Sequence, residues 1–274
     1  MPALPGRSEG VLDAAWLELE GTANARDLAG LPTVDGRTVR PHRLIRSDNL
    51  QDLTEQDLRV LVDEIGVRSV ADLRTDVEVA SEGPGPLTGH PEVDVVHLSL
   101  FPESGDNTDV AADGDGPVVL PWQNRDVEEK IGRKGTSAVY LGYLDQRADS
   151  VLAALRTIAR SPGATIVHCA AGKDRTGTVV ALALAEVGVT REAIVADYER
   201  SAERIEDIFA RLRSTRTYED DLSGADADKH APKAATMDRL LDALDEEFGG
   251  PQAWLRSHGW TDDDAAALRA KLLD

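Results

Sequence analysis

The chain has 274 residues, of which 41% are hydrophobic and 4% aromatic, and its formal net charge is −20. The length allows a substantial core, a core made mainly of Leu, Val, Ile and Ala favours helices packed on a sheet over a β-sandwich, and the acidic excess argues against nucleic acid or an anionic membrane as a partner. A single cysteine excludes an intramolecular disulfide and a four-cysteine metal site.

Helix and strand signals alternate in the first half of the chain. Thr54 and Asp57 form a capping-box pattern ahead of apolar residues at helical spacing, which predicts a helix that ends at Gly66. Short runs rich in β-branched residues predict strands over 67–73 and 94–98. This succession is typical of an α/β fold.

Two polar stretches interrupt these signals. Residues 101–135 are rich in Gly, Asp, Asn and Pro, which is typical of either a flexible insertion or a cover over a functional site. Residues 214–235 form a second, acidic stretch, which we interpret as a candidate lid segment. We therefore predict an N-terminal extension over 1–20 and a single domain over 21–274 that carries both stretches.

The second half of the chain predicts one buried strand and a series of helices. The strand covers 164–167, a fully apolar run that leads directly into a loop containing the cysteine. Helices are predicted over 137–160 (one helix or a broken pair), 178–187, 190–212, 236–248, 251–258 and 261–273.

Membrane and export signals are absent from the sequence. No run of about 18 apolar residues occurs. The first residues, Met1 to Arg7, contain no apolar secretory segment ahead of the first charge. We therefore expect a soluble protein without a transmembrane segment, located in the cytoplasm.

The loop after the buried strand reads His-Cys-Ala-Ala-Gly-Lys-Asp-Arg-Thr-Gly. Five residues separate Cys169 from Arg175, a spacing that lets the loop curl until its backbone N–H groups point at one phosphate. The guanidinium can hold two phosphate oxygens, and the following helix adds its positive N-terminal end. The residues expected to bind the phosphate of the substrate are His168, Ala170, Ala171, Gly172 and Lys173.

A thiol in such a loop is suited to nucleophilic catalysis. Helix N-termini and nearby cations lower the pKa of a cysteine by several units, so the field that binds phosphate also favours the thiolate of Cys169. Attack on a phosphate ester forms a phosphocysteine, which water then hydrolyses. The hydroxyl of Thr176 is placed to donate a hydrogen bond to the sulfur and ease its departure. This chemistry requires neither a metal nor a cofactor.

The oxygen of the leaving group needs a proton, so a carboxylic acid should lie on the far side of the phosphate. Asp174, inside the loop, is the preferred candidate. Glu103, at the start of the insertion, is the alternative. Weaker candidates in the same insertion are Asp106, Asp109, Asp113 and Asp115.

The loop resembles the signature of a bacterial tyrosine phosphatase family, and three further segments extend the resemblance from about residue 20 to the last helices. These segments are Asn24-Ala25-Arg26-Asp27-Leu28, Arg46-Ser47-Asp48-Asn49-Leu50, and Asp72-Leu73-Arg74 with Glu78. We interpret their charged residues as a buried ion and hydrogen-bond network that supports the loop, in preference to direct contacts with the substrate.

This resemblance implies a phosphatase-like α/β domain with a central, mostly parallel sheet flanked by helices, in which Cys169 is the nucleophile and Arg175 the phosphate clamp. It also implies activity on phosphotyrosine, and in some members on phosphoserine, phosphothreonine and phosphoinositides. Lys173 suits this breadth, since a second cation would help to hold a multiply phosphorylated head group. By the same resemblance, secretion without a recognisable signal peptide is an alternative to a cytoplasmic location.

The insertion departs from the family pattern. Glu103 stands where Asp is expected, and the glycine-rich stretch 104–117 does not favour the helical lid that family members can carry.

Two rival functions compete with a phosphatase. A binding module of the same fold would hold phospholigands without turnover, but such modules usually lose Cys169, Arg175 or Thr176, and all three are intact. Arsenate reduction would need further cysteines for a thiol relay. A nucleoside-triphosphate loop is excluded because Asp174 replaces the Ser or Thr that follows Lys in that motif.

Overall fold

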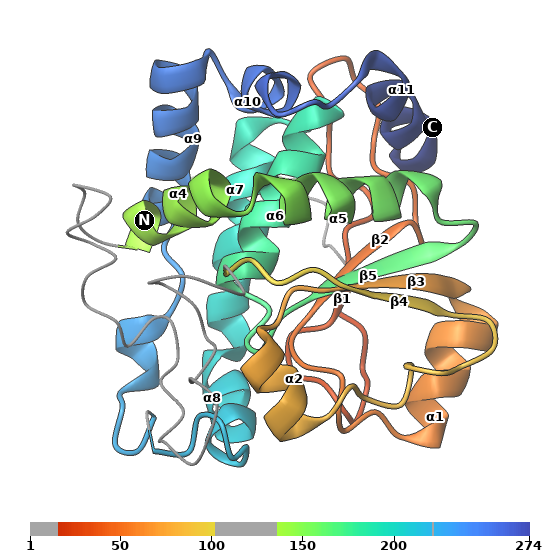
Figure 1. Ribbon diagram of the computed structural model, residues 1–274, viewed down its shortest axis with the longest axis vertical. Helices are drawn as coiled ribbons and strands as arrows, with labels where there is room; N and C mark the ends of the chain where they lie inside the picture. Colours follow the sequence, from red (N-terminus) through yellow and green to blue (C-terminus); the bar gives the residue numbers. More distant parts are fainter. Residues whose placement is uncertain (1–15, 102–135, 221) are drawn as a thin grey trace, which may run out of the picture.

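The computed structural model describes residues 16–101, 136–220 and 222–274. Within them, a five-stranded sheet with the strand order β1-β2-β5-β3-β4 forms the centre of the molecule (Figure 1). The strands are β1 (Arg26–Asp27), β2 (Leu44–Ser47), β3 (Val67–Asp72), β4 (Asp94–His97) and β5 (Ala164–His168). β1 is antiparallel to β2, and all other neighbours are parallel, which confirms the predicted α/β class and mostly parallel sheet.

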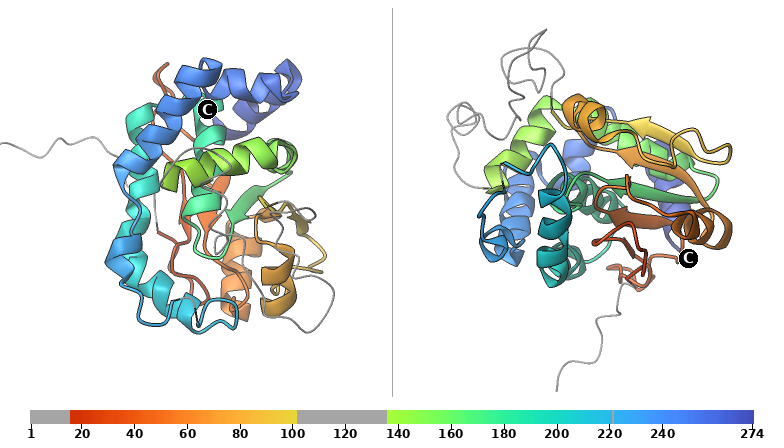
Figure 2. Two further views of the ribbon diagram at one scale, coloured as in Figure 1. Left: turned by 60° about the vertical axis from the view of Figure 1, so that its left-hand side comes forward. Right: turned by 90° about the horizontal axis from the view of Figure 1, so that it is seen from below.

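The helices of the described residues are α1 (Glu55–Leu58), the π-helix η1 (Arg59–Glu64), α2 (Asp76–Glu82), α4 (Thr136–Gln146), α5 (Ala148–Arg160), α6 (Asp174–Glu186), α7 (Arg191–Arg200), the 3₁₀ segment η3 (Ser201–Arg204), α8 (Ile205–Arg213), the 3₁₀ segment η4 (Ala227–His230), α9 (Ala234–Phe248), α10 (Pro251–Ser257) and α11 (Asp262–Leu272). α5 and α6 pack on one face of the sheet and η1 on the other. Figure 2 shows η4 beside α8 at one edge of the molecule.

β5 is central because its sequence, Ala-Thr-Ile-Val-His, suits a strand buried on both faces. Val167 points into the core that α5 and α6 cover, and Ile166 points into the core on the other face. The strand pairs with β2 and β3, so that His168 stands opposite Ser47 and Asp72. Sequence segments that are far apart in the chain therefore end together at the carboxyl edge of the sheet.

Several of the predicted helices and strands are confirmed. Two predictions become more precise: the helical stretch 137–160 and the helix that ends at Gly66. The stretch 137–160 is the broken pair, α4 and α5, because Arg147 leaves the helical region with φ −134° and ψ 43°. The helix predicted to end at Gly66 begins with the expected capping box at Thr54 but continues as a π-helix, closed by a hydrogen bond from Ile65 N to Val60 O (2.9 Å).

The single helix predicted over 190–212 is wrong, because the chain forms α7, η3 and α8 in this range. The interruption has a physical cause. The Asp197 carbonyl accepts a hydrogen bond from Arg26 Nη2 (2.7 Å) in place of a helical partner, and the Ser201 hydroxyl accepts another from the same nitrogen (3.2 Å). The regular α-helix is therefore interrupted where it contacts the buried side chain of Arg26.

The described residues include most of the second polar stretch but almost none of the first. Residues 102–135, with Glu103 and the weaker candidate acids, lie outside the described residues. In the stretch 214–235, the side chains of Tyr218 and Ala227 pack into a small core with residues of α8. Movement of this stretch as a lid stays a prediction.

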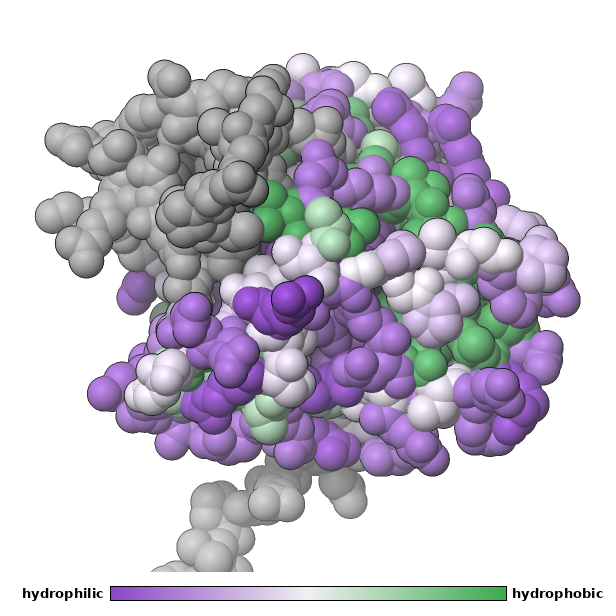
Figure 3. Space-filling view, turned by 60° about the horizontal axis from the view of Figure 1, so that its bottom comes forward, coloured by the Kyte–Doolittle hydropathy of each residue, from purple (hydrophilic) through white to green (hydrophobic). Residues whose placement is uncertain are grey.

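The surface is largely polar, as the net charge of −20 requires. Hydrophilic side chains surround smaller hydrophobic patches on the face shown in Figure 3. The large hydrophobic side chains that are exposed in the described part of the chain are Val34 and Phe248. Within the same part, no helix has both the length and the apolar character needed to span a bilayer.

Candidate active site

The loop with the cysteine connects the carboxyl end of β5 to the amino end of α6. Cys169 is 2% exposed and follows the last residue of the strand. Helix α6 begins at Asp174, four residues before the predicted start, so Arg175 and Thr176 lie in its first turn. The positive end of the helix is therefore directed at the loop, which is a common site for anions in parallel sheets.

The carbonyl groups of the loop are held outward by residues from distant segments. The acceptor and donor pairs are Ala170 O and Asn49 N (3.0 Å), Ala171 O and Asn24 Nδ2 (3.0 Å), and Gly172 O and Arg46 Nη2 (2.7 Å). Because the C=O and N–H groups of a trans peptide point in opposite directions, the N–H groups of residues 171–173 are turned to the inside of the loop. This arrangement provides donors for the oxygens of one phosphate.

Gly172 is required by this geometry. Its φ is +67°, a conformation that other residues adopt at a cost. A Cβ atom at this position would lie 2.4 Å from Ser47 O. The loop can pass this close to β2 only where the side chain is absent.

A buried ion network fixes the outer side of the loop. Asp197 of α7 accepts hydrogen bonds from Arg26 Nε (2.8 Å) and Arg46 Nη1 (2.6 Å), and all three side chains are at most 2% exposed. Burial alone would raise the pKa of Asp197, but the two guanidinium groups outweigh it and lower the pKa. Arg26 also holds Asn24 Oδ1 (2.6 Å), so the network reaches two of the three loop carbonyls.

A second network lies under the cysteine. Arg74 pairs with Asp72 (2.6 Å), whose other oxygen lies 3.4 Å from His168 Nε2. Burial lowers the pKa of His168 to about 4, more than Asp72 can raise it. The imidazole is therefore neutral at pH 7, and its Nδ1 lies 3.4 Å from Cys169 O, a place suited to orienting the loop and not to binding phosphate directly.

Arg175 is held by Glu78. The two guanidinium Nη atoms bind the two carboxylate oxygens, with 2.8 Å between Nη2 and Oε1. Glu78 is fully buried and also caps α2 by accepting a hydrogen bond from Thr75 N (2.7 Å). The Tyr218 hydroxyl donates to the same carboxylate, and the Phe101 ring lies 5.8 Å from the guanidinium.

Asp174 and Lys173 form an ion pair at the mouth of the loop, with 2.7 Å between Nζ and Oδ2. The Tyr140 hydroxyl also donates to Asp174, and Tyr198 lies 2.8 Å from that hydroxyl. Burial would raise the pKa of Asp174, but the Lys173 ammonium and these hydrogen bonds outweigh it and lower the pKa. The acid candidate is thus ionised while this ion pair persists.

The hydroxyl group of Thr176 is not part of these hydrogen-bond networks. Its Oγ1 is buried without a hydrogen-bond partner among the described residues, so the predicted bond to the Cys169 sulfur is not formed in this structure. A buried hydroxyl without a partner is costly, and it remains available for a charge that develops on the sulfur.

These side chains open onto a cleft of about 790 Å³ that Cys169, Lys173, Asp174 and Arg175 line from one side.

The sequence motifs identified Arg26, Arg46, Asp72, Arg74 and Glu78 as supporting residues. They did not identify a group of residues from the helices and the second polar stretch, namely Asp197, Tyr140, Tyr198 and Tyr218. Thr75-Asp76-Val77-Glu78 repeats the capping-box pattern, which could have placed Glu78 at the start of a helix.

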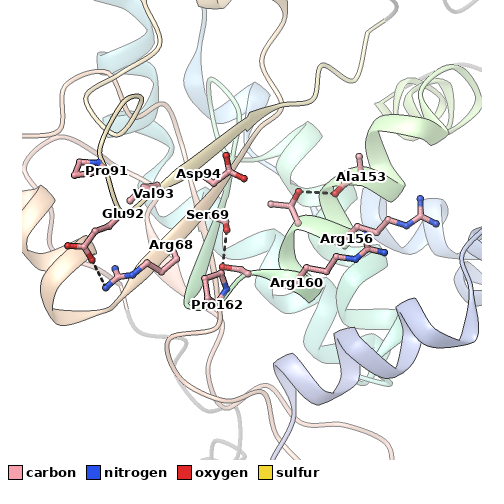
Figure 4. Close-up of a pocket in the computed structure, with 12 residues that line it drawn as sticks. Arg68, Ser69, Pro91, Glu92, Val93, Asp94, Ala153, Arg156, Arg160 and Pro162 are labelled. Carbon is pink, nitrogen blue, oxygen red and sulfur yellow. Dashed lines mark hydrogen bonds and ion pairs between the residues drawn. The ribbon is translucent and has the colours of Figure 1, made fainter.

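A second cleft, of about 630 Å³, lies at the amino ends of β3 and β4. Figure 4 shows Arg68 directed at Glu92, with which it pairs (2.9 Å). Arg156 and Arg160 extend from α5 to α11, where both pair with Asp264. The guanidinium groups of this cleft have carboxylate partners, and its lining contains no cysteine.

The model of the tyrosine phosphatase family matches residues 17–274. The chain belongs to the tyrosine phosphatase family. It is 31% identical over 282 residues to the triple specificity protein phosphatase PtpB of Mycobacterium tuberculosis, an alignment that covers 93% of this chain and 98% of that protein. A tyrosine-protein phosphatase of Nostoc commune is 25% identical over 88% of this chain and 78% of its own length.

Among solved structures, P. aeruginosa TpbA aligns over 74% of this chain and 89% of its own with 16% identity and a TM-score of 0.33. Membership of the tyrosine phosphatase family confirms the predicted enzyme class, a hydrolase that acts on phosphate monoesters. The roles of individual residues stay predictions.

Replacing Gly172 by Ala tests whether close packing of the loop on β2 shapes the phosphate site. Gly36→Ala is the matched control, because Gly36 also has a positive φ (+84°) but a Cβ atom added there would meet no atom within 4 Å. Backbone strain should lower the free energy of unfolding by roughly 1 kcal/mol in both variants, and the collision with the backbone of Ser47 should add to this cost in Gly172→Ala alone. Titration with vanadate should show at least about tenfold weaker binding for Gly172→Ala alone; equal affinities would contradict the assignment.

Proposed function

We propose that this phosphatase hydrolyses phosphotyrosine and related monoesters through a phosphocysteine formed on Cys169. The observation that carries the proposal is a buried thiol at the start of a loop whose carbonyls are tied outward, with Arg175 in the first turn of the following helix. Arg175 would hold two of the phosphate oxygens, and the N–H groups of residues 171–173 would bind the others.

In the first step, the Cys169 thiolate attacks phosphorus. The S–P bond forms as the ester P–O bond breaks, and the departing oxygen takes the electron pair of that bond together with a proton from Asp174. Arg175 and the loop N–H groups stabilise the charge on the three equatorial oxygens in the transition state.

In the second step, water attacks the phosphocysteine. Asp174, now ionised, takes a proton from the water, and the S–P bond breaks to return the thiolate and release inorganic phosphate. The Thr176 hydroxyl, which has no partner among the described residues, would donate to the departing sulfur.

Asp174 is supported as the acid by its place in the cleft next to the nucleophile. Its ion pair with Lys173 favours the carboxylate, so the acid has to gain its proton when the substrate binds. A bound phosphate would compete for the Lys173 ammonium. Loss of that contact would raise the pKa of Asp174 and favour the protonated form that the first step needs. Glu103 lies outside the described residues and stays the alternative.

The breadth of substrates is a further part of the proposal. The relative named a triple specificity protein phosphatase shares 31% identity over nearly all of the chain, and we extend the proposal to phosphoserine, phosphothreonine and phosphoinositides on that basis. Lys173 supports this extension, because it is a second cation beside the phosphate site. A location in the cytoplasm and the division at residue 20 stay predictions from the sequence.

Cys169→Ser should abolish the release of phenol from phenyl phosphate, because a serine hydroxyl at this position has no thiolate character. The assay contains EDTA, so that a contaminating metal phosphatase does not contribute. The variant should still bind vanadate or phosphate, since the loop is unchanged. Activity that survives the substitution would overturn the mechanism, and a wild-type protein that binds phosphate without turnover would identify a binding module.

Asp174→Asn should impair aryl esters according to their leaving groups. A phenol of high pKa needs a proton as it departs, so kcat/KM for such an ester should fall by about 10²-fold or more, whereas a nitrophenol ester should lose far less. Glu103→Gln is the comparison variant and should affect both esters equally. The opposite pattern would assign the acid to Glu103.

A further inference from the structure

A part of the cleft lining that lies outside the cysteine loop is basic. The segment between α8 and α9, at the left of Figure 1, contributes Lys229, His230 and Lys233 to the lining. Of the six lysines in the sequence, Lys229, Lys233 and Lys173 line this one cleft. A protein with a net charge of −20 thus places half of its lysines around its substrate site.

The charges of the lining are poorly compensated within the cleft. Asp174 is the carboxylate among the lining residues of the described chain, and Lys173 pairs with it. Lys229 reaches Asp226 only at 3.5 Å, and both side chains are more than half exposed. Lys233 is exposed, and its ammonium group forms no hydrogen bond or ion pair within the part of the chain that the structure describes. An anion entering the cleft therefore meets Lys233 and also Lys229, whose ion pair with Asp226 is long and exposed.

Part of the cleft lining is apolar or aromatic. Val139, Tyr143, Phe209 and Leu212 belong to this part, and the His230 ring lies 5.4 Å from the Phe209 ring. Such walls suit the aromatic ring of a phosphotyrosine whose phosphate sits on the cysteine loop.

We propose that Lys229 and Lys233 form a subsite for carboxylates that flank the phosphotyrosine, so that the preferred substrates are acidic phosphotyrosine peptides. The inference rests on the proposed function, because it assumes that the scissile phosphate occupies the cysteine loop. Exposed charge pairs contribute modestly and are screened by salt. The subsite should therefore act on KM more than on kcat, and its effect should decline at high ionic strength.

The test compares two phosphotyrosine peptides that differ only by Asp and Glu against Asn and Gln around the phosphorylated residue. The full-length wild-type chain should favour the acidic peptide about tenfold in kcat/KM at low salt. In Lys229→Gln/Lys233→Gln this ratio should fall to about twofold or less. The control, Arg59→Gln/Arg239→Gln, removes two exposed cations that do not line the cleft and should keep the ratio.

Hydrolysis of phenyl phosphate distinguishes a failure of the proposed function from a failure of the subsite alone. If the wild type does not hydrolyse phenyl phosphate, the proposed function itself is wrong. If it does but shows no preference for the acidic peptide, or if the lysine variant keeps the preference, the subsite is wrong and the function stands. A loss of kcat/KM for a soluble inositol bisphosphate without a change in the peptide ratio would also overturn the proposal, in favour of a head-group site.

Discussion

The bidentate pair between Glu78 and Arg175 is the contact on which the active site depends. A buried guanidinium without a partner would be costly, and a buried carboxylate equally so. Burial would raise the pKa of Glu78, but Arg175 outweighs it and lowers the pKa, so both groups stay charged. Because Glu78 also accepts a hydrogen bond from Thr75 N in the capping box of α2, the phosphate clamp is tied to the amino end of that helix before any substrate arrives.

Two other buried networks of charged residues hold the rest of the loop in place. Asp197 joins Arg26 and Arg46 behind the loop carbonyls, and Asp72 joins Arg74 beside His168. Arg74 is neutralised by Asp72, whereas Arg26 and Arg46 share the single carboxylate of Asp197. Inside the cleft the balance differs, because Lys229 and Lys233 have little compensation there. The acidic chain concentrates positive charge where a phosphate and its acidic neighbours would enter.

The cysteine loop could be predicted because its strand, nucleophile, clamp and helix are contiguous in the chain. The contacts that shape it are long-range and leave no local pattern. Asp197 is 151 residues from Arg46 and is one of 50 acidic residues, so no spacing distinguishes it. Tyr218 lies in a stretch interpreted as a lid, yet its hydroxyl reaches Glu78 across 140 residues. The break in the predicted helix 190–212 has the same origin, since it is imposed by Arg26 and not by the helix sequence.

The kcat/KM of Glu78→Gln for phenyl phosphate tests this account most directly, with Glu82→Gln as the control. Glu82 lies on the same helix and binds Thr217 of the same polar stretch, but it does not contact Arg175. In protein shown to be folded, loss of the charged partner should misalign the guanidinium and lower kcat/KM by about tenfold or more, whereas Glu82→Gln should change it little. Equal values for the two variants would contradict the claim that this buried pair holds the phosphate clamp.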